Sequence, residues 1–160
     1  MHRTHENIRA ALAAALALAC LAGAIITTPA AAAPMADLRG GVYPDQGVAV
    51  GGGVIGQLGS SPSWYFNPNV EAAFASQKDV VSMNADVHYD FRSTSPYNFY
   101  AGAGPALIIV NPDRGENRTD GGLNLVGGVN WHNQALRPFV QMKGVVSNEG
   151  QVALMGGVRF

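Results

Sequence analysis

Residues 81–91 read VSMNADVHYDF, and this stretch decides the fold class. Apolar residues occupy the odd-numbered positions from Val81 to Phe91, and polar residues occupy the even-numbered positions from Ser82 to Asp90. A repeat of two residues is the pattern of a β-strand whose two faces meet different surroundings. The stretch therefore predicts a strand with one apolar face and one polar face.

The same alternation recurs along the chain. Eight segments are expected to form strands: 37–43, 48–58, 64–74, 81–91, 97–110, 122–132, 136–147 and 151–160. Short connections rich in Gly, Pro, Asn and Ser join them, so neighbours in sequence should pair as antiparallel neighbours in space. A meander of eight strands closes most economically into a barrel, which removes both exposed edges. We expect an all-β, up-and-down barrel.

The first residues have a different pattern. A start containing Arg3 and Arg9 leads into an apolar run over 8–26 and then into the small residues Ala30 to Ala33. This order predicts a secretory signal peptide over 1–32 and a mature barrel domain over 33–160. A retained membrane helix is the alternative, since the apolar run is just long enough. Cleavage would also remove Cys20, the only cysteine.

Charge and hydropathy exclude several classes of protein. The formal net charge is −1, and the basic residues are scattered rather than clustered, so we expect no nucleic-acid partner. After residue 32 no apolar run is long enough for a membrane helix. If the mature chain spans a membrane, it must therefore do so as a barrel, which satisfies every backbone polar group.

Alternation alone leaves open which face lies inside, but the charges favour a polar interior. The polar and ionic side chains expected to line it are Arg39, Glu71, Asp86, His88, Asp90, Arg137, Lys143 and Arg159. An eight-stranded barrel is just wide enough to be filled by such side chains. Their opposite charges should pair there, because an isolated buried charge is costly.

The apolar faces point to lipid. Their aromatic residues lie toward strand ends, as in the girdles at the two water boundaries of a membrane barrel. Most of the segments are also close to the roughly 9–11 residues that cross a bilayer. The first segment, 37–43, is shorter than a full crossing requires.

The chain ends Gly156-Gly157-Val158-Arg159-Phe160. This end resembles the C-terminal strand of bacterial outer-membrane proteins, and the whole mature chain resembles the small eight-stranded outer-membrane β-barrel family that includes the OmpA transmembrane domain and OmpX. The resemblance implies the outer membrane as location. It also implies that the barrel assembly machinery reads Phe160, Val158 and Leu154 as an assembly signal. Unlike many members of that family, this chain has short outward connections.

No motif indicates catalysis, a cofactor or a metal. Residues 51–56 match G-x-G-x-x-G, but they lie inside an expected strand with no helix after it, so glycines that let the strand bend explain them better. His88 and His132 have no ligand-type spacing. Ser82 and His88 share a face but lie about 20 Å apart along an extended strand.

The resulting hypothesis is a non-catalytic outer-membrane barrel with a filled polar interior and short loops, structural or related to small solutes. We expect a monomer whose partners are outer-membrane lipid and, during biogenesis, the assembly machinery. One alternative is a periplasmic, lipocalin-like barrel with its apolar face inward around an apolar ligand. The other is an outer-membrane enzyme that modifies lipid.

Overall fold

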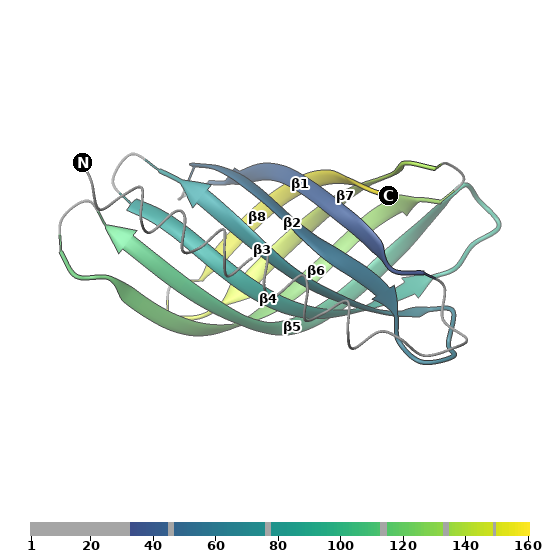
Figure 1. Ribbon diagram of the computed structural model, residues 1–160, viewed down its shortest axis with the longest axis horizontal. Helices are drawn as coiled ribbons and strands as arrows, with labels where there is room; N and C mark the ends of the chain where they lie inside the picture. Colours follow the sequence, from purple (N-terminus) through teal and green to yellow (C-terminus); the bar gives the residue numbers. More distant parts are fainter. Residues whose placement is uncertain (1–32, 45–46, 76–77, 113–114, 133–134, 149) are drawn as a thin grey trace.

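A computed structural model describes residues 33–44, 47–75, 78–112, 115–132, 135–148 and 150–160 (Figure 1). Its strands are β1 (Met35–Tyr43), β2 (Gly47–Gln57), β3 (Trp64–Phe74), β4 (Lys78–Phe91), β5 (Tyr97–Pro112), β6 (Arg118–Trp131), β7 (Arg137–Val146) and β8 (Gln151–Arg159). The expected signal peptide, 1–32, lies outside the described residues. No helix in the described part of the chain is long and apolar enough to cross a membrane.

The eight strands form one closed antiparallel barrel in the order of the sequence. Each strand pairs with the next, and β8 pairs back onto β1. At the seam, Ala36 and Phe160 exchange two backbone hydrogen bonds of 2.9 Å. The start of β1 and the end of β8 therefore lie at the same end of the barrel, which we call the terminal end. The predicted all-β meander barrel is confirmed.

The first strand is longer than the sequence indicated. β1 begins at Met35 rather than Asp37 and has nine residues, the same number as β8. Pairing of Met35 with Ile55 of β2 and of Ala36 with Phe160 after β8 extends the regular backbone beyond the clear alternation. The expectation that the first strand falls short of a crossing was wrong, since nine tilted residues span a bilayer.

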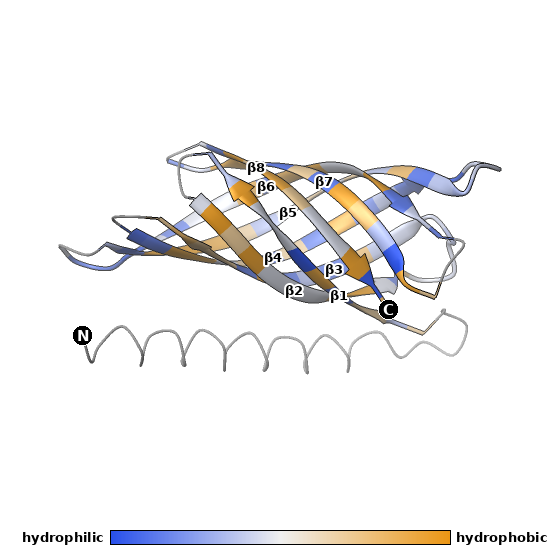
Figure 2. Ribbon diagram, turned by 90° about the horizontal axis from the view of Figure 1, so that it is seen from above, coloured by the Kyte–Doolittle hydropathy of each residue, from blue (hydrophilic) through white to orange (hydrophobic). Residues whose placement is uncertain are grey.

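The apolar face of the sheet lies on the outside. Leu154 and Met142 are 55 % and 63 % exposed, whereas Asn67 and Lys143 are fully buried. Figure 2 shows hydrophobic and hydrophilic residues alternating along the strands. This is the opposite of a lipocalin-like barrel, whose apolar face encloses the ligand, and it is the arrangement that suits a lipid solvent.

Outward aromatic side chains gather at the terminal end. Trp64 packs edge-to-face on Tyr89, with 5.0 Å between ring centroids, and Tyr89 packs in the same way on Phe91 at 5.1 Å. On the neighbouring strand β5, Tyr97 and Phe99 continue this aromatic belt, with 5.9 Å between their ring centroids. At the opposite end, Phe74 is the only aromatic among the exposed large hydrophobics that the structure describes. The sequence had suggested aromatic girdles at both water boundaries, whereas among the described residues one boundary is aromatic and the other mainly aliphatic.

Inward glycines make room for large side chains on the paired strand. The register places Gly51 opposite Glu71, Gly128 opposite Tyr100, and Gly157 opposite Phe139. A Cβ on Gly51 would lie 2.5 Å from the carbonyl oxygen of Val70. The glycines of 51–56 had been explained by strand bending. The structure gives a different reason for Gly51 and Gly53, because their neighbours fill the space that a side chain would need.

Two adjacent glycines of β6 test this explanation. We expect Gly128→Ala to lower the free energy of unfolding by about 1–3 kcal/mol, because its Cβ would lie 2.4 Å from the Val140 carbonyl oxygen and 2.7 Å from the Tyr100 ring. Gly127→Ala is the matched control, since its nearest contact is 3.9 Å away on the outer face. Urea unfolding in detergent measures both. Equal losses in the two variants would contradict the packing role.

Candidate functional site

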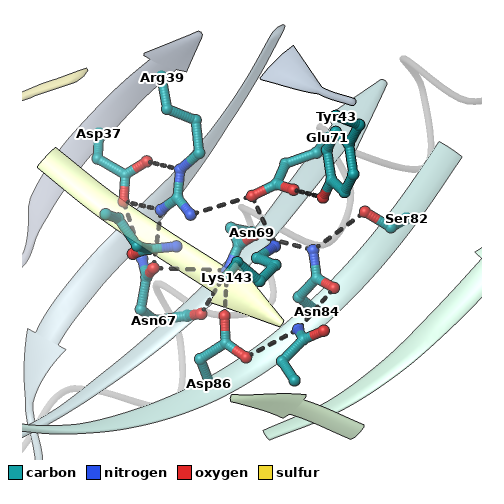
Figure 3. Close-up of polar contacts among 12 residues, drawn as sticks. Asp37, Arg39, Tyr43, Asn67, Asn69, Glu71, Ser82, Asn84, Asp86 and Lys143 are labelled. Carbon is teal, nitrogen blue, oxygen red and sulfur yellow. Dashed lines mark hydrogen bonds and ion pairs between the residues drawn. The ribbon is translucent and has the colours of Figure 1, made fainter. Parts of the chain in front are cut away.

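The centre of the barrel holds a network of buried charges (Figure 3). Glu71 of β3 accepts hydrogen bonds from Arg39 Nη1 at 3.3 Å, Lys143 Nζ at 2.7 Å and the Tyr43 hydroxyl at 2.7 Å. Arg39 also donates to both carboxylate oxygens of Asp37, at 3.0 and 2.6 Å. Each charged group in this network thus has hydrogen-bond partners of opposite polarity. Such pairing is required because a charge buried without partners is costly.

Amide side chains extend this network across β3, β4 and β6. Asn67 donates to Asp37 at 2.9 Å, and Asn69 donates to Asp86 at 3.0 Å. Asn124 reaches Asp86 from β6, also at 3.0 Å. Asp86 is fully buried, and both of its oxygens accept hydrogen bonds from amides. The carboxylate is thus stabilised by neutral donors rather than by a cation.

A layer of two aromatic rings, Phe139 and Tyr100, lies between the central network and the terminal end and contacts two guanidinium groups. The guanidinium carbon of Arg39 lies 5.6 Å from the Phe139 ring centroid, and that of Arg159 lies 4.6 Å from it. Arg159 also lies 5.3 Å from the Tyr100 centroid. His88 stacks on the other ring of this layer, Tyr100, at 5.2 Å. Cation–π contacts of this kind favour both guanidinium groups.

The two ends of the interior differ in chemistry. Toward the end opposite the termini, a cluster of buried apolar side chains fills the lumen: Tyr43, Ala49, Ala73, Val80, Ala106, Ile108, Val110, Val145, Ala153 and Met155. A cavity beside it has about 10 Å³, room for about one water molecule. At the terminal end, a polar cavity of ≈ 270 Å³ is lined by residues that include Asp90, Arg137 and Arg159.

The structure buries most of the interior residues named from the sequence. Arg39, Glu71, Asp86, His88, Asp90, Lys143 and Arg159 are buried, and Arg137 is partly exposed at the mouth. Of the three carboxylates, only Glu71 contacts cations. Asp86 is held by amides, Asp90 accepts from Asn130 at 3.1 Å, and neither Arg137 nor Arg159 forms an ion pair with a described residue.

Sequence reasoning missed Asp37, which binds Arg39 and is 1 % exposed. The sequence pattern did indicate this residue, because Asp37 and Arg39 are two positions apart and so lie on the same face of a strand. Asp37 was overlooked because it is the first residue of the strand expected over 37–43. The interior asparagines were not among the residues named from the sequence. Nothing local to the sequence indicates that Asn69 and Asn124 meet at one carboxylate.

The expected assembly residues lie on the outer face. Phe160 and Leu154 are 54 % and 55 % exposed, and Val158 points the same way in the alternation of β8. Among the described residues, no group of three or more His, Cys, Asp or Glu side chains is arranged to hold a metal ion. Both ring nitrogens of His88 lack a hydrogen-bond partner in the same part of the chain.

Comparisons with known proteins identify solved structures that have a similar fold. No protein-family model and no curated protein matches the sequence. Among solved structures, the N-terminal β-barrel domain of Pseudomonas aeruginosa OprF is similar, with a TM-score of 0.68 and 15 % identity over 79 % of this chain and 95 % of that one. Neisserial surface protein A has a TM-score of 0.60 and 19 % identity over 79 % and 92 %. Ail, the attachment invasion locus protein of Yersinia pestis, has 0.51 and 12 % over 79 % and 95 %.

The central ion pairs lead to a prediction. Glu71 is the one described residue that pairs with Lys143. We therefore expect Glu71→Gln to lower the free energy of unfolding by about 3–5 kcal/mol, because it leaves a buried ammonium unpaired. Lys143→Met should cost less, since Glu71 keeps Arg39 and Tyr43.

A double-mutant cycle in urea measures this coupling. The Glu71→Gln/Lys143→Met double variant should be more stable than Glu71→Gln alone, because the unpaired ammonium is gone. If the two losses simply added, the pair would not be coupled and the proposed role of the network would fail.

Proposed function

We propose that this chain, which has the fold of the small eight-stranded outer-membrane β-barrels, spans the bacterial outer membrane as a closed, non-catalytic structural barrel. The observation that carries the proposal is the combination of an apolar exterior with a lumen closed by side chains. A lumen of this kind serves to hold the barrel together rather than to pass solutes. Similarity to the solved structures supports the fold, and the side chains that fill the lumen support the structural role.

Two successive barriers favour a non-conducting lumen. Arg39, Glu71 and Lys143 join three strands across the centre, and opening a path there would separate fully buried charges. Beyond them the apolar cluster around Ile108 fills the opposite half. An ion crossing the second barrier would lose its hydration without gaining polar partners, which is costly in an apolar environment.

The outer surface supports a lipid environment and an orientation. Large apolar side chains such as Val50, Leu125 and Val152 are more than half exposed on different strands, so the apolar surface runs around the barrel. The aromatic belt marks one interface, as amphipathic rings do at a membrane boundary. We place this belt and the terminal end on the periplasmic side, which puts the connections after Tyr43, Phe74, Pro112 and Val146 outside the cell.

A catalytic role has less support. The nucleophile that sequence reasoning considered for His88 is Ser82, six positions along the same strand, and the ring of His88 stacks on Tyr100 instead. A nucleophile and its base must lie within hydrogen-bond reach. Ser82 and His88 therefore do not form the pair of groups that the lipid-modifying alternative requires.

Conductance tests the closed lumen. We expect the mature chain, folded in detergent and inserted into planar bilayers, to give no large, stable conductance steps, because the central network and the apolar cluster both close it. Heat-modifiable gel mobility of the same sample verifies that the protein is folded. Regular steps from verified, folded barrels would overturn the structural role and favour passage of small solutes.

The outward series Leu154, Val158 and Phe160 is proposed as the signal for the assembly machinery. We expect Phe160→Ala to reduce the amount of folded protein in the outer membrane, as measured by cell fractionation and heat-modifiable mobility. Refolding into detergent should be nearly unaffected, because the ring is 54 % exposed and contributes less than the roughly 1.5–3 kcal/mol of a fully buried apolar side chain. Phe74→Ala, an exposed aromatic change at the other end, is the control. Unchanged cellular levels of the Phe160 variant would remove this support for the outer-membrane location.

A further inference from the structure

The cavity at the terminal end of the barrel has a charge imbalance. The cavity has a volume of ≈ 270 Å³, and its lining contains three arginines, Arg92, Arg137 and Arg159, but one carboxylate, Asp90. With His132 neutral, these side chains carry a formal net charge of +2. Asp90 is partly satisfied already, since Asn130 donates to its Oδ2 at 3.1 Å. The mouth thus has more positive than negative charge.

None of the three arginines is in direct contact with a carboxylate of the described residues. Arg92, Arg137 and Arg159 form no ion pair with any residue that the structure describes. In the centre of the same barrel, by contrast, Arg39 and Lys143 both contact carboxylates. Arg92 is exposed and Arg137 partly exposed, so Arg159 is the buried arginine of the mouth. Since Arg39 and Lys143 are also buried and are both paired, the missing partner of Arg159 is not a general property of this interior.

Arg159 is the strongest indication of a missing anion. Its residue is 3 % exposed, and its Nε and Nη2 have no hydrogen-bond partner in the described part of the chain. The rings of Tyr100 and Phe139 contact the guanidinium, but rings accept no strong hydrogen bond from it. Burying a charged donor without an acceptor costs several kcal/mol, and an anion in the adjoining cavity would reduce that cost.

The strand register places a second cation beside it. Arg137 of β7 and Arg159 of β8 are directly paired positions on the inner face. Like charges in directly opposite positions destabilise a sheet. An anion between the two guanidinium groups would replace this repulsion with two attractive contacts, and guanidinium is the group that binds planar or tetrahedral oxyanions in a bidentate manner.

Neutral donors complete the lining. Asn98 Oδ1 accepts a hydrogen bond of 3.0 Å from the Ser93 backbone nitrogen, which fixes the orientation of the amide. Its Nδ2 then remains as a donor at the wall of the cavity. His132, in the same lining, has a buried Nδ1 without a partner among the described residues. Asn98 thus adds a neutral donor to the cationic lining.

We propose that this cavity binds a phosphate group. Its net charge matches a dianion, and its arginines supply the donors that such a group requires. The phosphate can belong to a soluble solute or to the headgroup of an anionic phospholipid at the same membrane boundary. The inference goes beyond the closed structural barrel proposed above, because binding at one mouth needs no passage through the lumen.

Calorimetric titration of inorganic phosphate into the full mature chain, folded in a non-ionic and phosphate-free detergent, tests the proposal. We expect saturable binding, with acetate and chloride binding more weakly at equal ionic strength. Arg137→Gln and Arg159→Gln should each weaken phosphate binding at least about tenfold, the usual effect of losing a charged hydrogen bond. Arg137 is partly exposed, so its variant should fold even if the Arg159 variant does not.

Arg118→Gln is the matched control, because it removes the same charge at the opposite end, where Arg118 pairs with Asp120 at 2.8 Å. It should bind phosphate as the unaltered chain does. Phosphate should also raise the urea midpoint of the unaltered chain and leave that of Arg137→Gln nearly unchanged. Absence of saturable binding, or equal weakening by Arg118→Gln, would overturn the proposal without affecting the structural role.

Reconstitution distinguishes the two sources of phosphate. Loss of phosphate binding in vesicles of phosphatidylcholine with phosphatidylglycerol, but not in phosphatidylcholine alone, would assign the cavity to a lipid headgroup. Binding that persists in both vesicles would assign it to a soluble phosphate compound. Either result supports the site, since both require the same arginine contacts.

Discussion

The hydrogen-bonded seam between β1 and β8 is the interaction on which the rest of the structure depends. An open sheet of eight strands would leave two rows of backbone N–H and C=O groups unpaired, and lipid offers no partner for them. The exchange between Ala36 and Phe160 brings the first and last strands together, and the ring has no edge. Closure also creates an inside, so that each strand has one face toward the lumen and the other toward its surroundings.

A closed ring of eight strands has a narrow lumen, and its packing follows from that limit. The two rings of the aromatic layer each lie beside a glycine, because Tyr100 is paired with Gly128 and Phe139 with Gly157. The remaining space takes side chains from non-adjacent strands. Lys143 of β7 reaches Glu71 of β3, and Asn124 of β6 reaches Asp86 of β4. These contacts tie opposite walls of the barrel together across the lumen.

The interior changes character along its axis, and this gradient separates the structural part from the part open to ligands. Apolar residues around Ile108 fill one end, neutralised charges fill the centre, and arginines without ion partners among the described residues surround the mouth. The charged groups of the central layer find partners within the barrel. Arg159 at the mouth does not, because its Nε and Nη2 have no acceptor among the described residues, and that difference distinguishes a candidate site from a packed core.

The sequence by itself determined the class of fold and the chemistry of each face. Period-two alternation is a property of one strand, so VSMNADVHYDF identifies a strand and its two faces without any knowledge of its neighbours, and the inward placement of Glu71, Asp86 and Lys143 follows from the same pattern. Only the tertiary structure decided which inward residues meet. Arg39 with Glu71, Glu71 with Lys143 and the unpaired Arg159 depend on the register between strands and on ring closure. Those contacts join residues as far as 72 positions apart, and no local pattern encodes the distance across a lumen.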